Sequence, residues 1–331
     1  MSRTLRTAED LAEAGLIARA DVPAMAAVAA RYSIALTPTV AALVAAHGAP
    51  IARQYIPHAA ELLTAPQELE DPTADAPFTP IKGVVHRYPD RALLKPLLAC
   101  PVYCRFCFRR EVVGPDGGLL TMPELDAALD WFAATPAVRE VILTGGDPLM
   151  LSPRRLAHIL TRLAAIPHIE ILRIHTRVPV ADPGRIDAAM LAALTLERPL
   201  YVCVHANHAA EFTNDAGPAL RGLHAAGVVL LGQSVLLRGV NDSGAALEAL
   251  FRAMLRHRVK PYYLHQLDPA PGTARFHVPV EEGLALMRAL RGRVTGLAWP
   301  TYVQEQAEGG GKIPLGMSGM HTRAGQPREA V

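Results

Sequence analysis

Three of the four cysteines in this 331-residue chain fall close together in the segment ACPVYCRFCFRR. Cys100, Cys104 and Cys107 have the spacing C-x3-C-x2-C, whereas Cys203 lies far along the chain in an apolar stretch. A structural zinc site needs four ligands, usually as two close pairs, so zinc is a poor match for this triplet. Three thiolates can instead hold a cubane iron–sulfur cluster with one iron open to an exogenous ligand. The spacing therefore favours a cluster over zinc or unrelated thiols.

A second candidate site lies in the segment ILTGGDPLM, which places Gly145, Gly146 and Asp147 at the end of an expected strand. Glycines let the backbone approach a ligand closely, and the aspartate can accept a hydrogen bond from a cationic group. The same residues also suit an ordinary turn in which the aspartate caps the following helix. Taken alone, the residues favour the turn.

Two further segments contain groups that suit a phosphorylated aldehyde cofactor. Lys312 follows three glycines in EGGGKIPLG, and Arg87, Tyr88 and Arg91 lie in HRYPDRALL. A lysine on a glycine-rich loop can form the Schiff base of pyridoxal 5′-phosphate (PLP), and two guanidiniums suit the oxygens of its phosphate. Taken alone, each segment is more typical of a solvated loop lysine or a surface cluster of ion pairs.

The elements that must position these residues follow from an alternation of short and long segments. From residue 87 onward, short apolar runs alternate with longer amphipathic stretches, a pattern typical of βα units and a parallel sheet. Six strands are expected between residues 141 and 303, in EVILTGG, IEILRIHTR, PLYVCVHAN, GVVLLGQSVLL, KPYYLHQL and GLAWPTYV, and a seventh is expected near ALLKPLL. This predicts an α/β fold, a partial (βα)6-type parallel barrel. Active sites on such barrels lie at the C-terminal ends of the strands, and the residues expected there are Cys100 onward, residues 144–147, His175, His205, Gln233, Asp268 and Glu305.

The sequence predicts three parts along the chain. Residues 1–75 contain Ala-rich helical segments and a Pro/Asp-rich linker, residues 76–316 form the barrel, and residues 317–331 form a C-terminal tail. The helical extension is expected to close the barrel interior against water.

Composition and charge limit the expected partners. The chain has 33 Lys and Arg against 31 Asp and Glu, so no net field favours nucleic acid or an anionic membrane surface. Acidic residues interrupt the apolar N-terminal stretch before a signal peptide or spanning helix could form. Four cysteines do not make a disulfide scaffold. A cytoplasmic protein that acts on a small molecule is expected.

Six motifs in one order resemble the lysine 2,3-aminomutase family of PLP-dependent radical S-adenosylmethionine (SAM) enzymes. They are HRYPDRALL, CPVYCRFCFRR, TGGDPLM, IPHIEILRIHTRVPV, KPYYLHQLD and GGGKIPL, within residues 72–316. Phe106 completes the pattern C-x3-C-x-aromatic-C, the signature of radical SAM enzymes. In that family the open iron binds SAM, and one electron cleaves SAM to a 5′-deoxyadenosyl radical.

The resemblance implies cofactor roles for most of the candidate residues. It implies that the three clustered cysteines bind a 4Fe–4S cluster. The residues implied to line the SAM pocket are Gly145, Gly146, Asp147, His205 and Gln233. The residues implied to hold PLP are Arg87, Tyr88 and Arg91 at the phosphate and Lys312 at the Schiff base.

The resemblance also implies how a substrate would be held. Arg109 matches the residue that pairs with the substrate carboxylate, and Asp268 and Glu305 match two acids that face the far end of the substrate. Two carboxylates would neutralise a remote ammonium in a desolvated pocket and would repel a glutamate side chain, so L-lysine is the expected substrate. The alternative is that both acids are solvated loop residues.

The resemblance implies an isomerase that converts L-lysine to β-lysine by 1,2-amino migration, fed by a flavodoxin-like or ferredoxin-like reductant. Without a cysteine-rich C-terminal tail, and with Glu305 as the second acid, the chain is similar to short bacterial forms that make (R)-β-lysine for elongation factor P. No structural zinc is expected, and a homodimer is compatible with the sequence.

Two alternatives remain open from the sequence. The first is another amino-acid 2,3-aminomutase, such as one that acts on glutamate. The second is a non-catalytic iron–sulfur protein, which would leave the GGDP, HRYPDR and GGGK motifs unexplained. Cys203, in an apolar strand, is expected to be a buried core residue.

Overall fold

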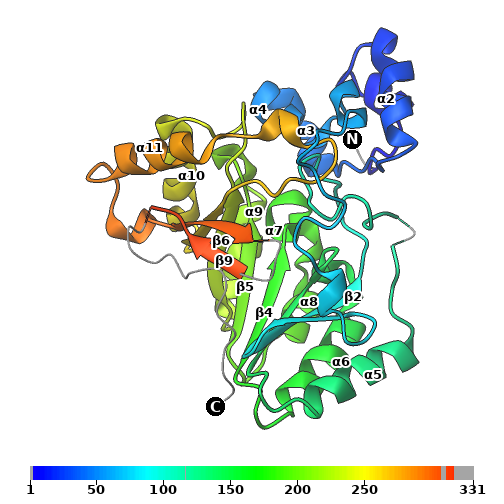
Figure 1. Cartoon of the computed structure of the whole chain (residues 1–331), viewed down its shortest axis with the longest axis vertical. Helices are drawn as coiled ribbons and strands as arrows, with labels where there is room; N and C mark the ends of the chain where they lie inside the picture. The colour runs from blue at the N-terminus through cyan, green and yellow to red at the C-terminus, as the bar shows by residue number, and fades with distance from the viewer. Residues whose placement is uncertain (1–2, 116, 307–310, 317–331) are drawn as a thin grey trace.

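The computed structural model describes residues 3–115, 117–306 and 311–316, and their chain path forms a mixed α/β barrel (Figure 1). Within these residues, nine strands make one sheet in the order of the chain, from β1 to β9. Strands β2 to β8 are parallel to one another, and the edge strands β1 and β9 run antiparallel to their neighbours. The sheet is therefore a partial parallel barrel, as the sequence predicted.

The strands lie where apolar runs were expected. They are β1 (Val84–Tyr88), β2 (Arg91–Leu97), β3 (Glu140–Gly145), β4 (Ile171–Thr176), β5 (Leu200–His205), β6 (Val229–Val235), β7 (Lys260–His265), β8 (Thr301–Gln306) and β9 (Gly311–Pro314). The six strands predicted between residues 141 and 303 are confirmed, and β2 is the seventh. Cys203 is fully buried in β5, as expected.

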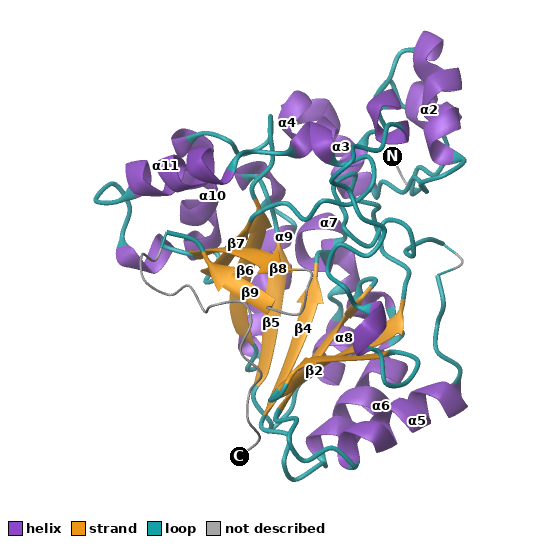
Figure 2. Cartoon of the chain, viewed as in Figure 1, coloured by secondary structure: helices purple, strands orange, loops and turns teal. Residues whose placement is uncertain are grey.

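Helices follow the parallel strands and surround the sheet, and Figure 2 shows α5, α6, α10 and α11 at the periphery of the central strands. They are α5 (Met122–Ala133), α6 (Pro153–Ala164), α7 (Val178–Ala181), α8 (Ala188–Leu194), α9 (Ala216–Ala225), α10 (Gly244–Arg256) and α11 (Val280–Leu290). Short 3-10 turns lie between them: η4 (Pro148–Met150), η5 (Pro183–Arg185), η6 (Ala209–Glu211), η7 (Ala274–Phe276) and η8 (Gly296–Ala298).

Helix α6 illustrates why these segments are helical. Leu156, Ile159, Leu160 and Leu163 are fully buried and have the i, i+3, i+4, i+7 spacing of one helical face. The hydroxyl of Ser152 accepts a hydrogen bond from the third helical amide and caps the N-terminus. The apolar face thereby fixes the helix against the sheet.

Proline shapes the strand that leads into the cysteine segment. Pro96 has no amide hydrogen to donate to a ladder, and the pairing of β2 with β3 shifts register between Leu94 and Leu97. Beyond this irregularity the chain leaves the sheet, and the three clustered cysteines lie on the loop that follows β2. The proline therefore lies where the regular strand gives way to the loop.

The N-terminal segment is helical. It contains α1 (Ala8–Glu13), η1 (Arg19–Asp21), α2 (Val22–Ala29), α3 (Pro38–His47), α4 (Ala49–Tyr55), η2 (Ala59–Leu62) and η3 (Ala76–Phe78). Helices α2, α3 and α4 lie at one end of the molecule, away from α5 and α6 (Figure 1). Leu11, Leu36 and Val40 belong to a small apolar core of this segment, and Val102 of the cysteine loop packs into the same core. The helical segment is thus packed against the cysteine loop.

The predicted tail, residues 317–331, and the two glycines at 309 and 310 lie outside the described residues. The division of the chain at residue 75 stays a prediction. In the part of the chain that the structure describes, no helix has the length and hydropathy needed to cross a membrane.

Candidate active site

Two adjoining cavities lie within the barrel: the smaller is at the C-terminal ends of the parallel strands, and the larger extends to Arg91, Glu140 and Ile171, where strands begin. One has a volume of about 500 Å³ and contains the HRYPDR side chains, and the other has about 240 Å³ and contains all three clustered cysteines. Arg109, Gln233, Glu305 and Lys312 line both. Every site residue predicted from the sequence lines at least one of the two cavities. The fold thus brings together residues separated by more than 200 positions in the sequence.

The cysteine loop presents three reduced thiols to the smaller cavity. Cys100, Cys104 and Cys107 form no disulfide, and all three lie on its wall. The Arg177 guanidinium donates a hydrogen bond to Cys104 Sγ at 3.1 Å, and the backbone amide of Arg109 donates to the Cys107 thiol. Hydrogen bonds to sulfur are typical of thiolates that ligate metal, since they help to stabilise the negative charge.

The donor set fits a cluster better than a single ion. Among the described residues, no three His, Cys, Asp or Glu side chains meet as a single metal ion would require. Three thiolates that bind different irons of a cubane need not meet at one point. Burial raises the pKa of Cys107 to about 11, so metal binding itself must supply the free energy for deprotonation.

The Gly-Gly turn after β3 supports the cysteine loop. Gly145 has φ +103°, and a Cβ on Gly146 would lie 2.3 Å from the carbonyl oxygen of Ala99. The amide of Asp147 donates to that same carbonyl at 2.9 Å. Both glycines are needed here because one has a left-handed backbone and the other leaves no space for a side chain.

The Asp147 carboxylate is occupied by protein donors. It accepts hydrogen bonds from the Thr176 hydroxyl at 2.6 Å, the Arg177 amide at 2.7 Å and the Leu149 amide at 3.1 Å. The Asp147 side chain therefore acts as the cap that the sequence allowed. The turn also forms part of the cavity wall. Its direct contact with SAM stays a prediction.

The aromatic residue of the cysteine motif packs against a predicted SAM-pocket residue. The Phe106 ring makes an edge contact with His205, with 5.6 Å between ring centroids. Burial and the nearby Arg177 cation lower the pKa of His205 well below its ordinary value, so its imidazole is neutral. The side chain of Gln233, on β6, lies in the region shared by the two cavities.

The HRYPDR and GGGK motifs meet across the larger cavity. The Tyr88 hydroxyl accepts a hydrogen bond from the Lys312 amide at 2.7 Å, and a Cβ on Gly311 would lie 2.4 Å from that hydroxyl. The Arg91 guanidinium stacks on the Tyr88 ring at 3.6 Å. In the described part of the chain, the buried Arg87 Nε has no hydrogen-bond partner. Two guanidiniums, a phenol and a lysine around a cavity of about 500 Å³ fit a phosphorylated cofactor.

Glu305 and Lys312 are opposite each other in the antiparallel pair β8–β9. The Lys312 ammonium donates to Glu305 Oε2 at 2.6 Å, and Arg87 donates to Glu305 Oε1 at 2.5 Å. Glu305, which the resemblance assigns to the substrate, is therefore paired here with two residues assigned to PLP. A bound cofactor and substrate would have to exchange these partners.

Asp268 lines the smaller cavity and is partly buried. Burial raises its pKa to about 7, with a further upward contribution from Glu305 and a downward contribution from Lys312. At neutral pH the carboxyl group is therefore divided between its neutral and anionic forms. A cationic ligand nearby would shift it towards the anion.

Sequence reasoning missed an acid that pairs with Arg109. The Arg109 guanidinium donates to Asp75 Oδ2 at 2.9 Å, and Asp75 also lies 3.4 Å from nitrogen atoms of Lys95 and Arg87. Burial opposes ionisation of Asp75, but the neighbouring cations, Arg109 above all, hold its pKa well below the usual range. One feature of the sequence pointed to such an acid: Lys95 is a charged residue within the apolar strand β2, and a charge in that position needs a partner.

Two further histidines line both cavities. His175 is the second-last residue of β4, and His265 is the last residue of β7. Burial lowers the pKa of His265 to about 3 and that of His175 well below its ordinary value. In the described structure His175 Nε2 is buried without a partner. Their signal in the sequence was their position at strand ends.

Comparisons with known proteins agree with this geometry. Residues 94–217 match the family model of the Radical SAM superfamily. The L-lysine 2,3-aminomutase of Clostridium subterminale is 41% identical over 266 residues, which are 80% of this chain and 64% of that enzyme. The glutamate 2,3-aminomutase of Clostridioides difficile is 36% identical over 80% of this chain and 63% of that enzyme. The chain therefore matches less than two thirds of the length of either enzyme.

A third relative is matched over more of its length. This protein, from Aquifex aeolicus, is provisionally named an L-lysine 2,3-aminomutase and is 38% identical over 86% of this chain and 78% of its own. The match thus covers more than two thirds of both proteins. The chain belongs to the lysine 2,3-aminomutase family of radical SAM proteins.

Proposed function

We propose that this protein is an L-lysine 2,3-aminomutase, an isomerase that converts L-lysine to β-lysine. The observation that carries the proposal is the pair of adjoining cavities. One contains the three cysteines, the other contains the HRYPDR side chains, and Lys312 and Arg109 belong to both. A substrate bound at Lys312 would thus lie next to the cysteine loop, as a reaction between two cofactors requires.

The residues present fit three cofactors. Cys100, Cys104 and Cys107 would hold a 4Fe–4S cluster, and the turn 145–147 with His205 and Gln233 would line the SAM site. The PLP site would be formed by Arg87, Tyr88, Arg91 and Lys312. When bound, the cluster and SAM supply a carbon-centred radical, and PLP supplies an aldehyde and a ring that delocalises an unpaired electron.

The protein side chains would prepare Lys312 for covalent attachment. The amine is a nucleophile only when uncharged, and its ammonium donates to Glu305 Oε2 at 2.6 Å. Glu305 is therefore placed to accept a proton from Lys312 Nζ. Arg87, which is paired with the same carboxylate, would become free for phosphate when Glu305 turns to the substrate.

Arg109 would orient the substrate carboxylate, with Asp75 as its partner until the substrate arrives. The guanidinium is 12% exposed and lines both cavities, so a carboxylate can reach it in place of Asp75. Asp268 and Glu305 lie in the wall of the smaller cavity and would neutralise a side-chain ammonium. These acids support lysine over glutamate.

Glutamate is the second candidate substrate, and one observation favours it. The pKa of Asp268, raised to about 7, leaves part of this carboxyl group protonated at neutral pH. A protonated Asp268 could donate a hydrogen bond to a substrate carboxylate. The relative from Clostridioides difficile is named for glutamate.

The test is an anaerobic turnover assay. The cluster is reconstituted, PLP, SAM and a strong reductant are added, and L-lysine or L-glutamate is supplied. Chiral chromatography then identifies the β-amino acid. We expect β-lysine, lost in Cys104→Ala and in Lys312→Ala. SAM cleavage without either β-amino acid would contradict the substrate assignment and retain the radical chemistry.

We further propose that the product is (R)-β-lysine used to modify elongation factor P, with a flavodoxin-like or ferredoxin-like protein as the electron donor. Glu305 as the second acid supports this branch of the family. Deleting the gene should remove β-lysyl groups from elongation factor P, as measured by mass spectrometry. Unchanged modification would contradict the proposal.

A further inference from the structure

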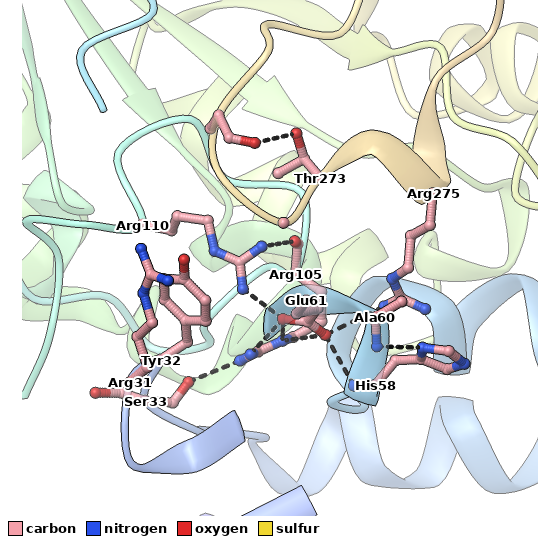
Figure 3. A network of polar contacts seen from close by, with 12 residues as sticks. Arg31, Tyr32, Ser33, His58, Ala60, Glu61, Arg105, Arg110, Thr273 and Arg275 are labelled. Carbon is pink, nitrogen blue, oxygen red and sulfur yellow. Dashed lines mark hydrogen bonds and ion pairs between the residues drawn. The ribbon is translucent and has the colours of Figure 1, made fainter. Parts of the chain in front are cut away.

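A buried carboxylate in the N-terminal segment holds three arginines at once (Figure 3). Glu61, on η2, is fully buried and lies outside the walls of both cavities. Its Oε2 accepts hydrogen bonds from Arg105 at 2.6 Å and from Arg110, and its Oε1 lies 3.4 Å from Arg275 Nη2. Oε1 also accepts from the His58 amide at 2.9 Å, so protein donors surround the whole carboxylate.

The three arginines come from two loops of the active site. Arg105 lies between two of the clustered cysteines, and Arg110 lies three residues after Cys107. Arg275, on η7, belongs to the loop that follows β7 and begins near Asp268. One side chain of the N-terminal segment therefore contacts both the cysteine loop and the loop that carries the predicted substrate acid.

The N-terminal segment fixes the cysteine loop at several further points. The Arg105 amide donates to the Gln54 carbonyl at 2.8 Å, and Arg105 Nη1 donates to the Ser33 carbonyl at 2.9 Å. The Arg110 guanidinium stacks on the Tyr32 ring at 3.6 Å. Arg105 and Arg110 are thus held by several residues of the N-terminal segment, and Glu61 neutralises part of their charge.

A second acid of the same segment offers a comparison. Glu68 accepts hydrogen bonds from the amides of Gly272, Thr273 and Ala274 at 2.7–2.9 Å. A Cβ on Gly272 would lie 2.2 Å from the Glu61 carbonyl oxygen, so the two chain segments are in close contact. Glu68 therefore holds the loop after β7, as Glu61 does, but it has no described contact with the cysteine loop.

We propose that Glu61 is a positioning residue that sets the cysteine loop and the Asp268 loop relative to each other. Removing its charge leaves two buried guanidiniums and one partly buried guanidinium to repel one another, so both loops should lose their positions together. The functional consequence rests on the proposed function, which assigns the cluster to the cysteine loop and a substrate contact to the Asp268 loop. The loop coupling itself does not depend on any cofactor.

The first test uses hydrogen–deuterium exchange of the cofactor-free protein, followed by mass spectrometry. Glu61→Gln should accelerate exchange several-fold in both 100–110 and 268–276. Glu68→Gln, the matched buried control, should accelerate exchange in 268–276 alone, and Glu170→Gln at the surface should change neither. Unchanged exchange of 100–110 in Glu61→Gln would overturn the proposal.

A pair of milder variants covers the case in which Glu61→Gln does not fold. Arg110→Gln and Arg275→Gln each leave Glu61 with two arginine partners. Arg110→Gln should loosen 100–110 and lower the iron bound per chain after reconstitution, and Arg275→Gln should loosen 268–276 with iron unchanged. The proposal is wrong if the two variants leave the exchange of both loops unchanged. It is also wrong if both variants accelerate exchange in the same loop.

Kinetics separate positioning from general stability. Arg275→Gln should raise the KM for lysine several-fold with little change in kcat, and Arg275→Lys should restore most of the affinity. If Arg275→Gln and Arg275→Lys lower kcat equally and leave KM unchanged, the role of Arg275 is structural only, and the positioning role is overturned. If lysine is not the substrate, the exchange and iron measurements still test the coupling of the loops.

Discussion

Two networks of acidic and basic side chains in this protein have the same chemistry and different surroundings. Glu61 with Arg105, Arg110 and Arg275 lies between the N-terminal segment and the active-site loops, outside both cavities. Glu305 with Arg87 and Lys312 lies in a cavity wall, as does Asp75 with Arg109.

The difference decides what each network can do. A ligand cannot reach Glu61, so its ion pairs are permanent and their loss leaves uncompensated charge. A carboxylate or a phosphate can enter the cavity and take the place of Asp75 or Glu305. The cavity network is therefore exchangeable, and we expect its variants to affect binding and turnover more than folding.

The largest expected effect is the loss of turnover in Lys312→Ala. This variant should make no detectable β-lysine and should lose the PLP–lysine absorbance, because the amine that binds the cofactor is gone. Its free energy of unfolding should change by about 1 kcal/mol or less, since the ion pair with Glu305 is partly exposed. Lys82→Ala, which removes a surface lysine, serves as the control. Borohydride trapping of PLP on Lys312→Ala at full stoichiometry would contradict the assignment.

A large effect on stability is expected for the permanent network. Glu61→Gln should lower the free energy of unfolding by about 3–5 kcal/mol, because buried guanidiniums lose their counter-charge. Glu305→Gln should lower it by about 1 kcal/mol, since Arg87 keeps its contact with Asp75. Urea unfolding of the cofactor-free variants measures both. Equal losses would remove the distinction between the two networks.

A moderate effect is expected from pH. Burial raises the pKa of Asp268 to about 7, so the carboxyl is neutral below that pH and anionic above it. An ammonium ligand needs the anion, so the apparent affinity for lysine should rise up to about tenfold per pH unit below pH 7 and level off above it. Asp268→Asn should bind lysine weakly and lose this dependence. Affinity that falls as the pH rises would indicate a substrate carboxylate instead.

The smallest effect is expected for the acid that competes with the substrate. Asp75→Asn should lower the KM for lysine about fivefold, equivalent to about 1 kcal/mol, because Arg109 no longer has a competing carboxylate. Steady-state kinetics measure the change, with Asp242→Asn, a surface partner of Arg238, as control. A higher KM would show that Asp75 contacts the substrate ammonium.

Much of the fold was predictable because the physical signals are local. The apolar runs that became β2 to β8 are short, β-branched and separated by helical segments, and parallel pairing follows from that alternation. The C-terminal ends of the strands then had to carry the site. The partners of the side chains were not predictable, because they depend on distances between segments far apart in sequence.

Asp147 and Glu305 illustrate this limit. GGDP suited both a ligand turn and a helix cap, and the structure shows the carboxylate occupied by the Thr176 hydroxyl and three backbone amides. The pairing of Glu305 with Lys312 depends on the antiparallel register of β8 and β9, which residue types do not specify.

The sequence by itself determined the chemistry available to this protein: three thiols in C-x3-C-x2-C, a lysine after glycines, and a series of βα units that places them at one end of a barrel. Residue type and spacing carry that information, because ligand number and strand periodicity are local properties. Only the tertiary structure decided that Glu61 is buried among three arginines while Asp75 and Glu305 face a cavity. Burial and access to ligand arise from packing between distant segments, and they determine whether an ion pair is permanent or exchangeable.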